Sequence, residues 1–183
     1  MKNFLIIGGS SGIGKELANQ LSQSDHQVFA TYNKNKPEQE SSNIHFHQFN
    51  VLEENLSTDF FPEELSGIAY CPGSINLRPF DRIKPEDFEA DYKLQVIGAI
   101  KLIQLVLPRL KKSGNASIVL FSTVAVQTGL PFHTQVAASK GAIEGLEENI
   151  HPLKTNTSSL FLLVKSLTCI YAVISGSSSN SEF

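Results

Sequence analysis

Cysteine is scarce in this 183-residue chain. The two cysteines, Cys71 and Cys169, lie far apart and have no metal-ligand spacing. This argues against a zinc site or a disulfide-stapled scaffold, and it favours a reducing, cytoplasmic setting. Clusters of lysine and arginine are also missing and the formal net charge is −3, so nucleic acid is not an expected partner. We expect no metal.

Long apolar runs are missing as well. Residues 4–7 are too short for the core of a signal peptide, and Gly8 and Gly9 follow at once. Residues 160–174 are apolar, but the stretch is short for a membrane span and Lys165 interrupts it. We therefore expect no membrane partner. The hydrophobic fraction of 41% instead predicts a globular protein.

Glycine is concentrated at the N-terminus. The apolar residues 4–7 predict a strand, Gly8, Gly12 and Gly14 follow in a turn, and apolar residues then recur at helical spacing. Such a strand–turn–helix brings backbone close to an anion and points free helix N–H groups at it. The spacing is Gly-x-x-x-Gly-x-Gly, and its place between strand and helix indicates a site for a dinucleotide diphosphate.

Two other interpretations of this loop are open. A tight turn between strand and helix needs no ligand, although three glycines in seven residues exceed what a turn requires. Residues 9–15 also fit the start of a triphosphate-binding loop, whose next residue should carry a hydroxyl for magnesium. That residue is Glu16, whose carboxylate would repel phosphates.

Strand and helix patterns alternate along the chain. Strands are predicted at residues 4–7, 27–32, 44–49, 67–71 and 116–121, and helices after the glycine loop, from Pro85 to 112 and over 134–148. The alternation predicts an α/β fold with a doubly wound parallel sheet and right-handed crossovers. We expect residues 1–150 to form one domain and residues 151–183 to be an atypical tail with a disordered end.

Four segments, in this order, resemble the short-chain dehydrogenases/reductases: Gly-Gly-Ser-Ser-Gly-Ile-Gly at 8–14, Tyr-Cys-Pro-Gly at 70–73, Ser-Thr-Val-Ala at 122–125 and Ala-Ala-Ser-Lys-Gly-Ala at 137–142. The resemblance extends to about Asn149. It implies a Rossmann fold and hydride transfer between a nicotinamide dinucleotide and a small carbonyl, alcohol or enoyl substrate. It also implies a homodimer or homotetramer formed through the helices at 85–112 and 134–149.

The resemblance further implies the site. The family's serine falls on Thr123, with Ser122 beside it, and the family's ribose-binding lysine falls on Lys140. Because Asn33 and Lys34 follow the second strand in place of a carboxylate, NADP is favoured over NAD. The alternatives are that Lys34 and Lys140 are solvated surface lysines, and that the hydroxyls of Ser122 and Thr123 cap a strand. The cofactor-binding residues are expected to be Gly8, Ser10, Ser11, Gly12, Ile13, Gly14, Asn33, Lys34, Asn50, Val51, Cys71, Pro72, Gly73 and Lys140.

The resemblance breaks at the proton donor. Val136 stands four residues before Lys140, where the family has a tyrosine, and it has no proton to give. We expect Val136 to pack against apolar neighbours. Gln95 replaces the family's helical asparagine. His133 lies near enough in sequence to supply a proton, although a loop histidine is the simpler interpretation.

The family pattern also stops after Asn149. The later strand and substrate-covering segment are not found there, and the tail is either a pair of edge strands or the end of a truncated or frame-shifted product, which we favour. In both cases the sheet is expected to be incomplete at its C-terminal edge. Three hypotheses follow: an oxidoreductase with a non-standard site, a dinucleotide sensor without redox chemistry, or a fragment of such an enzyme.

Overall fold

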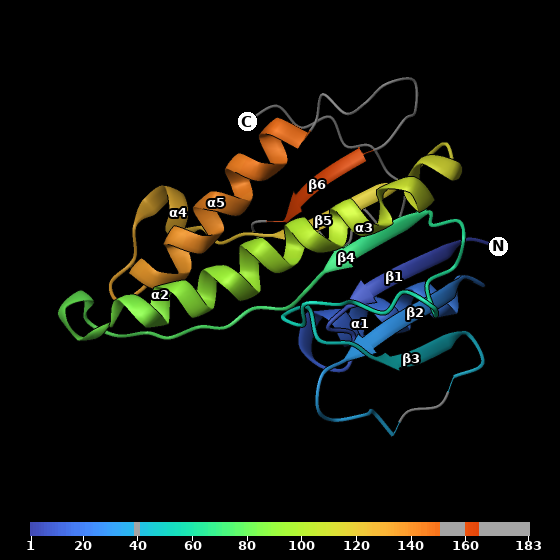
Figure 1. Ribbon diagram of the computed structural model, residues 1–183, viewed down its shortest axis with the longest axis horizontal. Helices are drawn as coiled ribbons and strands as arrows, with labels where there is room; N and C mark the ends of the chain where they lie inside the picture. The colour runs from blue at the N-terminus through green and yellow to red at the C-terminus, as the bar shows by residue number, and fades with distance from the viewer. Residues whose placement is uncertain (39–40, 151–159, 165–183) are drawn as a thin grey trace.

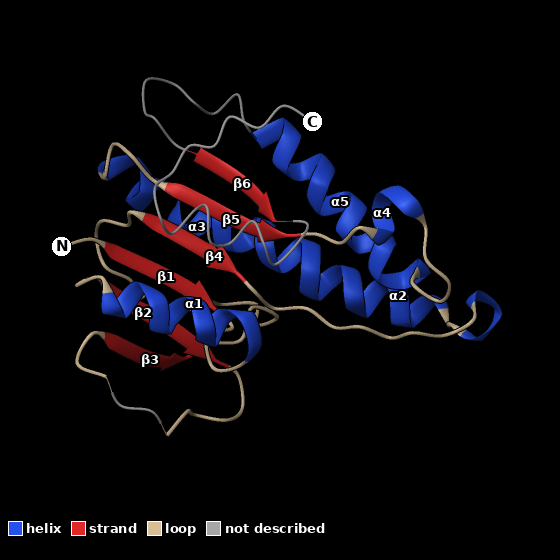
Figure 2. Cartoon of the chain, turned by 180° about the vertical axis from the view of Figure 1, so that it is seen from behind, coloured by secondary structure: helices blue, strands red, loops and turns tan. Residues whose placement is uncertain are grey.

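The computed structural model describes residues 1–38, 41–150 and 160–164. Their strands form one six-stranded parallel sheet in the order β3-β2-β1-β4-β5-β6 (Figures 1 and 2). The order reverses direction between β1 and β4, as in a Rossmann fold, which confirms the predicted fold class. The strands are β1 Asn3–Ile7, β2 Gln27–Tyr32, β3 Ile44–Gln48, β4 Gly67–Tyr70, β5 Ser117–Phe121 and β6 Leu160–Val164.

Helices cover both faces of the sheet. Figure 2 shows α1 in front of β1 and β2, with α3 behind the sheet. The helical elements are α1 Gly12–Gln23, η1 Phe80–Arg82, α2 Pro85–Tyr92, η2 Lys93–Ile97, α3 Gly98–Lys112, α4 Ala125–Thr128 and α5 Thr134–Ile150. The long helix predicted from Pro85 to 112 is present, but η2 is a π-helical turn within it. The short η1 and α4 were not predicted.

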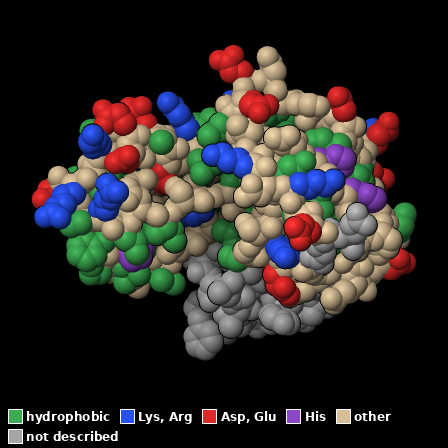
Figure 3. Space-filling model, turned by 90° about the horizontal axis from the view of Figure 1, so that it is seen from below, with side chains coloured by type: hydrophobic (Ala, Val, Ile, Leu, Met, Phe, Trp, Pro, Cys, Tyr) green, Lys and Arg blue, Asp and Glu red, His purple; other side chains and the backbone are tan. Residues whose placement is uncertain are grey.

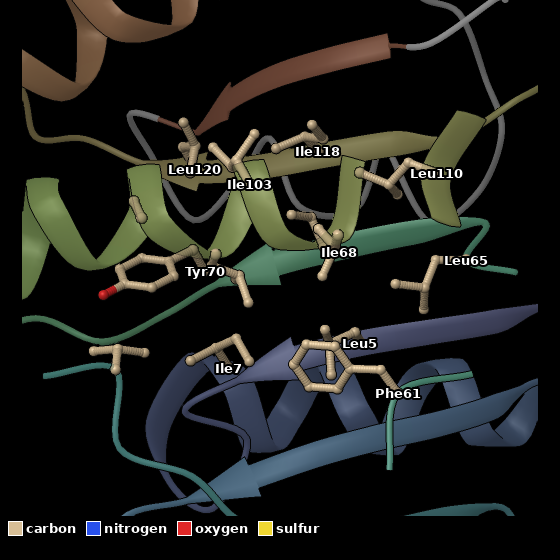
Figure 4. Packing of buried hydrophobic residues seen from close by; sticks show 14 of the residues in the cluster. Leu5, Ile7, Phe61, Leu65, Ile68, Tyr70, Ile103, Leu110, Ile118 and Leu120 are labelled. Atoms are coloured by element: carbon tan, nitrogen blue, oxygen red, sulfur yellow. The ribbon is translucent and has the colours of Figure 1, made fainter. Parts of the chain in front are cut away.

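Alternation along the strands divides the core into two layers. On β1, Leu5 and Ile7 are buried against the α3 side, where Figure 4 shows them with Ile68 and Ile103. Ile6, between them, is buried with residues of α1 on the other face. Because successive side chains point to opposite faces of a strand, this apolar run is buried on both sides, as expected of a parallel sheet.

The tail contributes a strand to this sheet. β6 pairs in parallel with β5, from Ser117 opposite Leu160 to Phe121 opposite Val164. This residue stretch therefore forms an edge strand, which one of the two interpretations of the tail predicted. The other predictions for residues 151–159 and 165–183 lie outside the described residues. Among the helices that the structure describes, none has the length and apolar character needed to cross a lipid bilayer.

Candidate functional site

The glycine-rich loop after β1 depends on residues that lack a Cβ. Gly8 and Gly12 adopt φ angles of +79° and +54°, which side chains disfavour. A Cβ on Gly14 would collide with the carbonyl oxygen of Gly8. The loop is fixed to β2, because the Gly8 N–H donates to Thr31 Oγ1 at 3.0 Å and the Gly9 N–H donates to the Thr31 carbonyl at 2.9 Å. The backbone is thus held in a shape that an ordinary residue at Gly14 would disrupt.

The first turn of α1 is open at its N-terminus. Ser11 is the N-cap residue, and its side chain makes no capping hydrogen bond. The first turn carries no acidic residue. The early N–H groups of a helix have no partner within the helix, and they carry its positive dipole end. The loop and helix together therefore present donors suited to an anion such as a diphosphate.

A cleft of about 580 Å³ opens at the carboxyl ends of β1, β2 and β4. All of the predicted cofactor-binding residues except Lys34 and Lys140 line it. Asn50 is among them, and its side-chain oxygen accepts the Leu52 N–H at 3.1 Å in a local turn. Sequence reasoning missed five lining residues. All but Leu94, which lies in η2, are in or shortly after a strand end, a position that could have indicated them. These additional residues are Ile7, Thr31, Phe49, Leu52 and Leu94.

A buried carboxylate organises the other side of the site. Asp91 of α2 is only 3% exposed. One of its oxygens accepts from the Ser74 hydroxyl at 2.6 Å, and the other accepts from the Ser139 hydroxyl at 2.6 Å. The Gln95 amide Nε2 donates to both oxygens at 2.8 Å. Asp91 therefore ties together the segment after β4, the π-helical turn and α5.

Lys140 lies beside this cluster. Its Nζ is 3.9 Å from the position that a Cβ would take on Gly73, and Gln95 Oε1 is 3.3 Å from the same point. Burial lowers the pKa of Lys140 to about 8, although Asp91 and Cys71 act in the opposite direction. Burial raises the pKa of the Cys71 thiol to about 12, against the effect of Lys140. The absence of a Cβ on Gly73 keeps open a space that an amine and an amide oxygen both face.

The remaining predicted groups have local partners. The Ser122 hydroxyl donates to Glu144 of α5. Thr123 Oγ1 accepts the Ala125 N–H at 3.3 Å, at the start of α4, and that contact leaves its own hydrogen free to donate. His133 Nδ1 contacts the Pro131 carbonyl at 2.7 Å. Val136 is buried, with 5% of its surface exposed.

Apolar side chains are exposed on the segments that follow β4 and α4. The segment after β4 exposes Ile75 and Phe80 by 71% and 69%, and the segment after α4 exposes Phe132 by 53%. Figure 3 shows hydrophobic side chains gathered at one end of the molecule, on the left. Phe132 also has a φ of +66°, a backbone conformation that aromatic residues rarely adopt. Such a backbone conformation costs free energy in a residue other than glycine.

Comparison with known proteins decides the family. A family profile described as short chain dehydrogenase matches residues 2–157. The chain belongs to the short-chain dehydrogenase family. This confirms the resemblance carried by the four sequence segments, and it places the glycine loop and the cleft within a family of oxidoreductases.

Individual relatives are distant and longer. The uncharacterized oxidoreductase YusZ of Bacillus subtilis is 27% identical over 163 residues, which are 80% of this chain and 57% of YusZ. Human 17-beta-hydroxysteroid dehydrogenase type 1 is 26% identical over 164 residues, 80% of this chain and 50% of that protein. The chain thus spans about half the length of these relatives.

A solved structure shows the same fold. The short chain dehydrogenase family protein from Francisella tularensis subsp. tularensis SCHU S4 superposes with a TM-score of 0.81. The two are 23% identical, and the match covers 97% of this chain and 78% of the other. At this identity the likeness establishes the architecture.

Proposed function

We propose that the protein is an NADP-dependent oxidoreductase that interconverts an apolar carbonyl or enoyl compound and its reduced form. The observation that carries the proposal is the cleft at the glycine loop, where Gly14 has no room for a Cβ and the first amides of α1 are open. These features fit a dinucleotide diphosphate. When bound, the nicotinamide group supplies or accepts the hydride.

The chain's own residues would then bind the dinucleotide and orient the substrate. Backbone amides from Ser10 to Gly14 would hold the diphosphate, because those of Gly8 and Gly9 already donate to Thr31. The Thr123 hydroxyl, whose hydrogen is free, would donate to the substrate oxygen. Ser122 is the weaker candidate for that role, because its hydroxyl already donates to Glu144. Lys140 supplies positive charge next to Gly73. The buried Val136 contributes no proton.

The preference for NADP rests on the end of β2. Asn33 lines the cleft and Lys34 is exposed beside it, so neither residue repels a 2′-phosphate. A carboxylate at this place would hold the ribose hydroxyl of NAD instead. We expect NADPH to bind at least tenfold more tightly than NADH. Asn33→Asp should reverse the preference, and Lys34→Ala should weaken NADPH alone by several-fold, since one charge-assisted contact is lost.

Calorimetry with both dinucleotides tests this preference. Lys36→Ala is the matched control, because Lys36 is also exposed but, unlike Lys34, is not adjacent in the chain to Asn33, which lines the cleft. Its NADPH affinity should equal that of the unchanged protein. Failure of the unchanged protein to bind either dinucleotide would remove the proposal, and equal losses in the Lys34 and Lys36 variants would remove the preference for NADP.

Exposed apolar side chains support an apolar substrate. Ile75 and Phe80 follow Gly73 in the chain and Phe132 precedes α5, and all three expose large hydrophobic side chains that an apolar substrate would cover. The name of the human relative specifies a hydroxysteroid, which is also a largely apolar alcohol. Reduction of decanal should therefore be faster than reduction of a charged aldehyde such as glyoxylate, measured by NADPH absorbance. A preference for glyoxylate would contradict the apolar assignment.

A dinucleotide sensor is the second candidate, and the buried Val136 is the observation that favours it. A sensor would bind NADPH but reduce no aldehyde or ketone. Turnover of decanal that Lys140→Met abolishes would exclude this candidate.

We also propose a homodimer or homotetramer in the cytoplasm. Tyr92 and Ile97, which are 43% and 37% exposed, form an apolar surface with Phe88 and Ala138 between the α2–η2 segment and α5. Sedimentation of the full chain tests the assembly. Tyr92→Glu should yield monomers if these helices form the interface, because burying an unpaired carboxylate is costly.

A further inference from the structure

The family tyrosine has been replaced by a buried valine, so a reductase built on this chain needs another proton donor. His133 is a poor one, because it does not line the cleft and its Nδ1 is engaged with the Pro131 carbonyl in its own loop. Lys140 instead faces the space over Gly73, which lines the cleft. An ammonium group carries a transferable proton, whereas the valine side chain carries none.

Gln95 has a side-chain oxygen without a partner in the same space. The side chain is 1% exposed, and among the described residues Oε1 has no hydrogen-bond partner. A buried carbonyl oxygen left unpaired costs free energy, so a donor is expected there. Oε1 and Lys140 Nζ are 3.3 Å and 3.9 Å from one point over Gly73, so the ammonium is a donor that shares this space with the oxygen.

Asp91 determines which way the Gln95 amide points. Nε2 donates to both Asp91 oxygens at 2.8 Å and approaches the Ser74 carbonyl at 3.4 Å. Flipping the amide would place Oε1 against the two carboxylate oxygens. All three atoms are acceptors, so no hydrogen bond could form between them. The Ser74 and Ser139 hydroxyls hold the carboxylate from two further elements, so it cannot turn away. Oε1 is therefore locked on the side of Gly73 and Lys140.

We propose that Lys140 delivers the proton to the substrate oxygen, and that Asp91 and Gln95 are positioning residues that hold its ammonium over Gly73. The inference rests on the proposed reductase function. In the step, the carbonyl carbon would accept a hydride, which a bound reduced nicotinamide would supply, so that a C–H bond forms while the C=O π bond breaks. An N–H bond of the ammonium breaks as the O–H bond forms. The products are the alcohol, the oxidised dinucleotide and neutral Lys140, which water reprotonates.

The charges around Lys140 suit this role. Asp91 faces it from α2 and Cys71 from the end of β4, while Glu144 on α5 is engaged by Ser122 and Gln127. Burial dominates and lowers the pKa of Lys140 to about 8. The ammonium is then largely present at pH 7 and is a stronger acid than an exposed lysine, close to the range in which general acids work well.

Chemical rescue tests the proton transfer. Lys140→Ala should keep NADPH binding within tenfold but lose decanal turnover by about 10²–10⁴-fold. Added methylamine, 2-fluoroethylamine and 2-methoxyethylamine should restore turnover, and at equal concentration of the protonated form the more acidic amine should restore more. In the unchanged protein, turnover should fall as pH rises above about 8. Lys93→Ala, an exposed lysine of η2, is the control and should behave as the unchanged protein.

The positioning role has its own readouts. Asp91→Asn keeps the shape but removes the charge that raises the Lys140 pKa, so the fall in turnover should begin at lower pH. Gln95→Leu should lower turnover with little change in that pH. ¹³Cε NMR of labelled lysine in the ligand-free protein, with the Lys140 signal assigned by Lys140→Ala, should show titration below the ordinary lysine range and a further decrease in Asp91→Asn.

The outcomes separate this inference from the function on which it rests. No NADPH binding by the unchanged protein removes the proposed function itself. Binding and turnover, with rescue absent or indifferent to the acidity of the amine, overturn the inference alone. An ordinary titration of Lys140 by NMR also overturns the inference alone. Binding without any turnover of decanal instead removes the reductase function, and the inference with it, and leaves the dinucleotide sensor.

Discussion

At the β1–α1 end of the cleft the functional groups are backbone amides, whereas at the α2–α5 end they are the side chains of Asp91, Gln95 and Lys140. The first arrangement requires that Gly8, Gly12 and Gly14 lack a Cβ. The second requires particular atoms from three elements. The first end therefore keeps the family pattern, while one substitution, Val136, changes the chemistry at the second. The difference suggests that dinucleotide binding and proton transfer can be damaged separately.

Gly14→Val should give the largest effect at the backbone end. Its Cβ would collide with the Gly8 carbonyl, so the loop must shift, and the clash should cost about 3 kcal/mol of stability. NADPH affinity should fall more than about 100-fold, since it depends on the position of several amides. Urea unfolding followed by circular dichroism and NADPH calorimetry measure the two effects.

Gly145→Ala is the matched control for that variant. Gly145 lies in α5, and a Cβ there would meet nothing within 4 Å. Alanine should raise stability by about 0.5–1 kcal/mol and leave NADPH affinity unchanged. Equal behaviour of the two variants would show that the collision at Gly14 is absent.

Asp91→Leu tests the side-chain end. It leaves the Ser74 and Ser139 hydroxyls and the Gln95 amide buried without their acceptor, and we expect a loss of about 3 kcal/mol in the free energy of unfolding. NADPH affinity should stay within about threefold, because no Asp91 atom lines the cleft. A large loss of affinity in a folded variant would show that the two ends are not separable.

Thr31→Val should give a smaller effect at the backbone end. It removes the acceptor of the Gly8 N–H, a contact of 3.0 Å, and should cost about 1–2 kcal/mol. The loop loses one tether, so NADPH should bind several-fold more weakly. Thr128→Val, which removes an exposed hydroxyl that donates to the Val124 carbonyl, should cost less than about 0.5 kcal/mol. Equal losses of stability in the two variants would show that the hydrogen bond from Gly8 to Thr31 does not hold the loop.

The pH dependence of stability should show the smallest effect. The pKa of Lys140 is lowered from 10.5 to about 8 in the folded state, so between these values the unfolded chain binds more protons and stability rises with pH. Cys71, whose pKa is raised from 9.0 to about 12, lowers stability as pH rises above 9. From pH 8 to 9 the unchanged protein should therefore gain up to about 1 kcal/mol relative to Lys140→Met. Thermal melting at both pH values measures the gain, and parallel curves would contradict it.

The parts that could be predicted from the sequence are those set by local pattern. The predicted strand at 27–32 and the helix from Thr134 match β2 and α5, because apolar spacing directly reflects which face is buried. The glycine loop was recognisable because close backbone approach demands glycine at fixed spacing. The fold and the lining of the cleft follow from these features.

The Asp91 cluster could not be predicted in the same way. Its contact with Ser139 spans 48 positions in the chain and its contact with Ser74 spans 17, so neither pair is adjacent until the sheet forms. From the sequence, only the Asp91–Gln95 contact could be expected, because these two residues lie one helical turn apart. The short helices η1 and α4 were missed because three or four residues are too few to show a helical period.

The π-helical turn at Lys93–Ile97 joins a helix that carries polar groups into the site to one that packs in the core. Each residue of an α-helix advances about 100° around the axis, so one residue fewer in this turn would rotate α2 by that angle relative to α3. Asp91 would then leave Ser139 while Leu102 and Val106 kept their places. The position of Asp91, and of the groups that it holds beside Lys140, thus depends on a single π-helical turn.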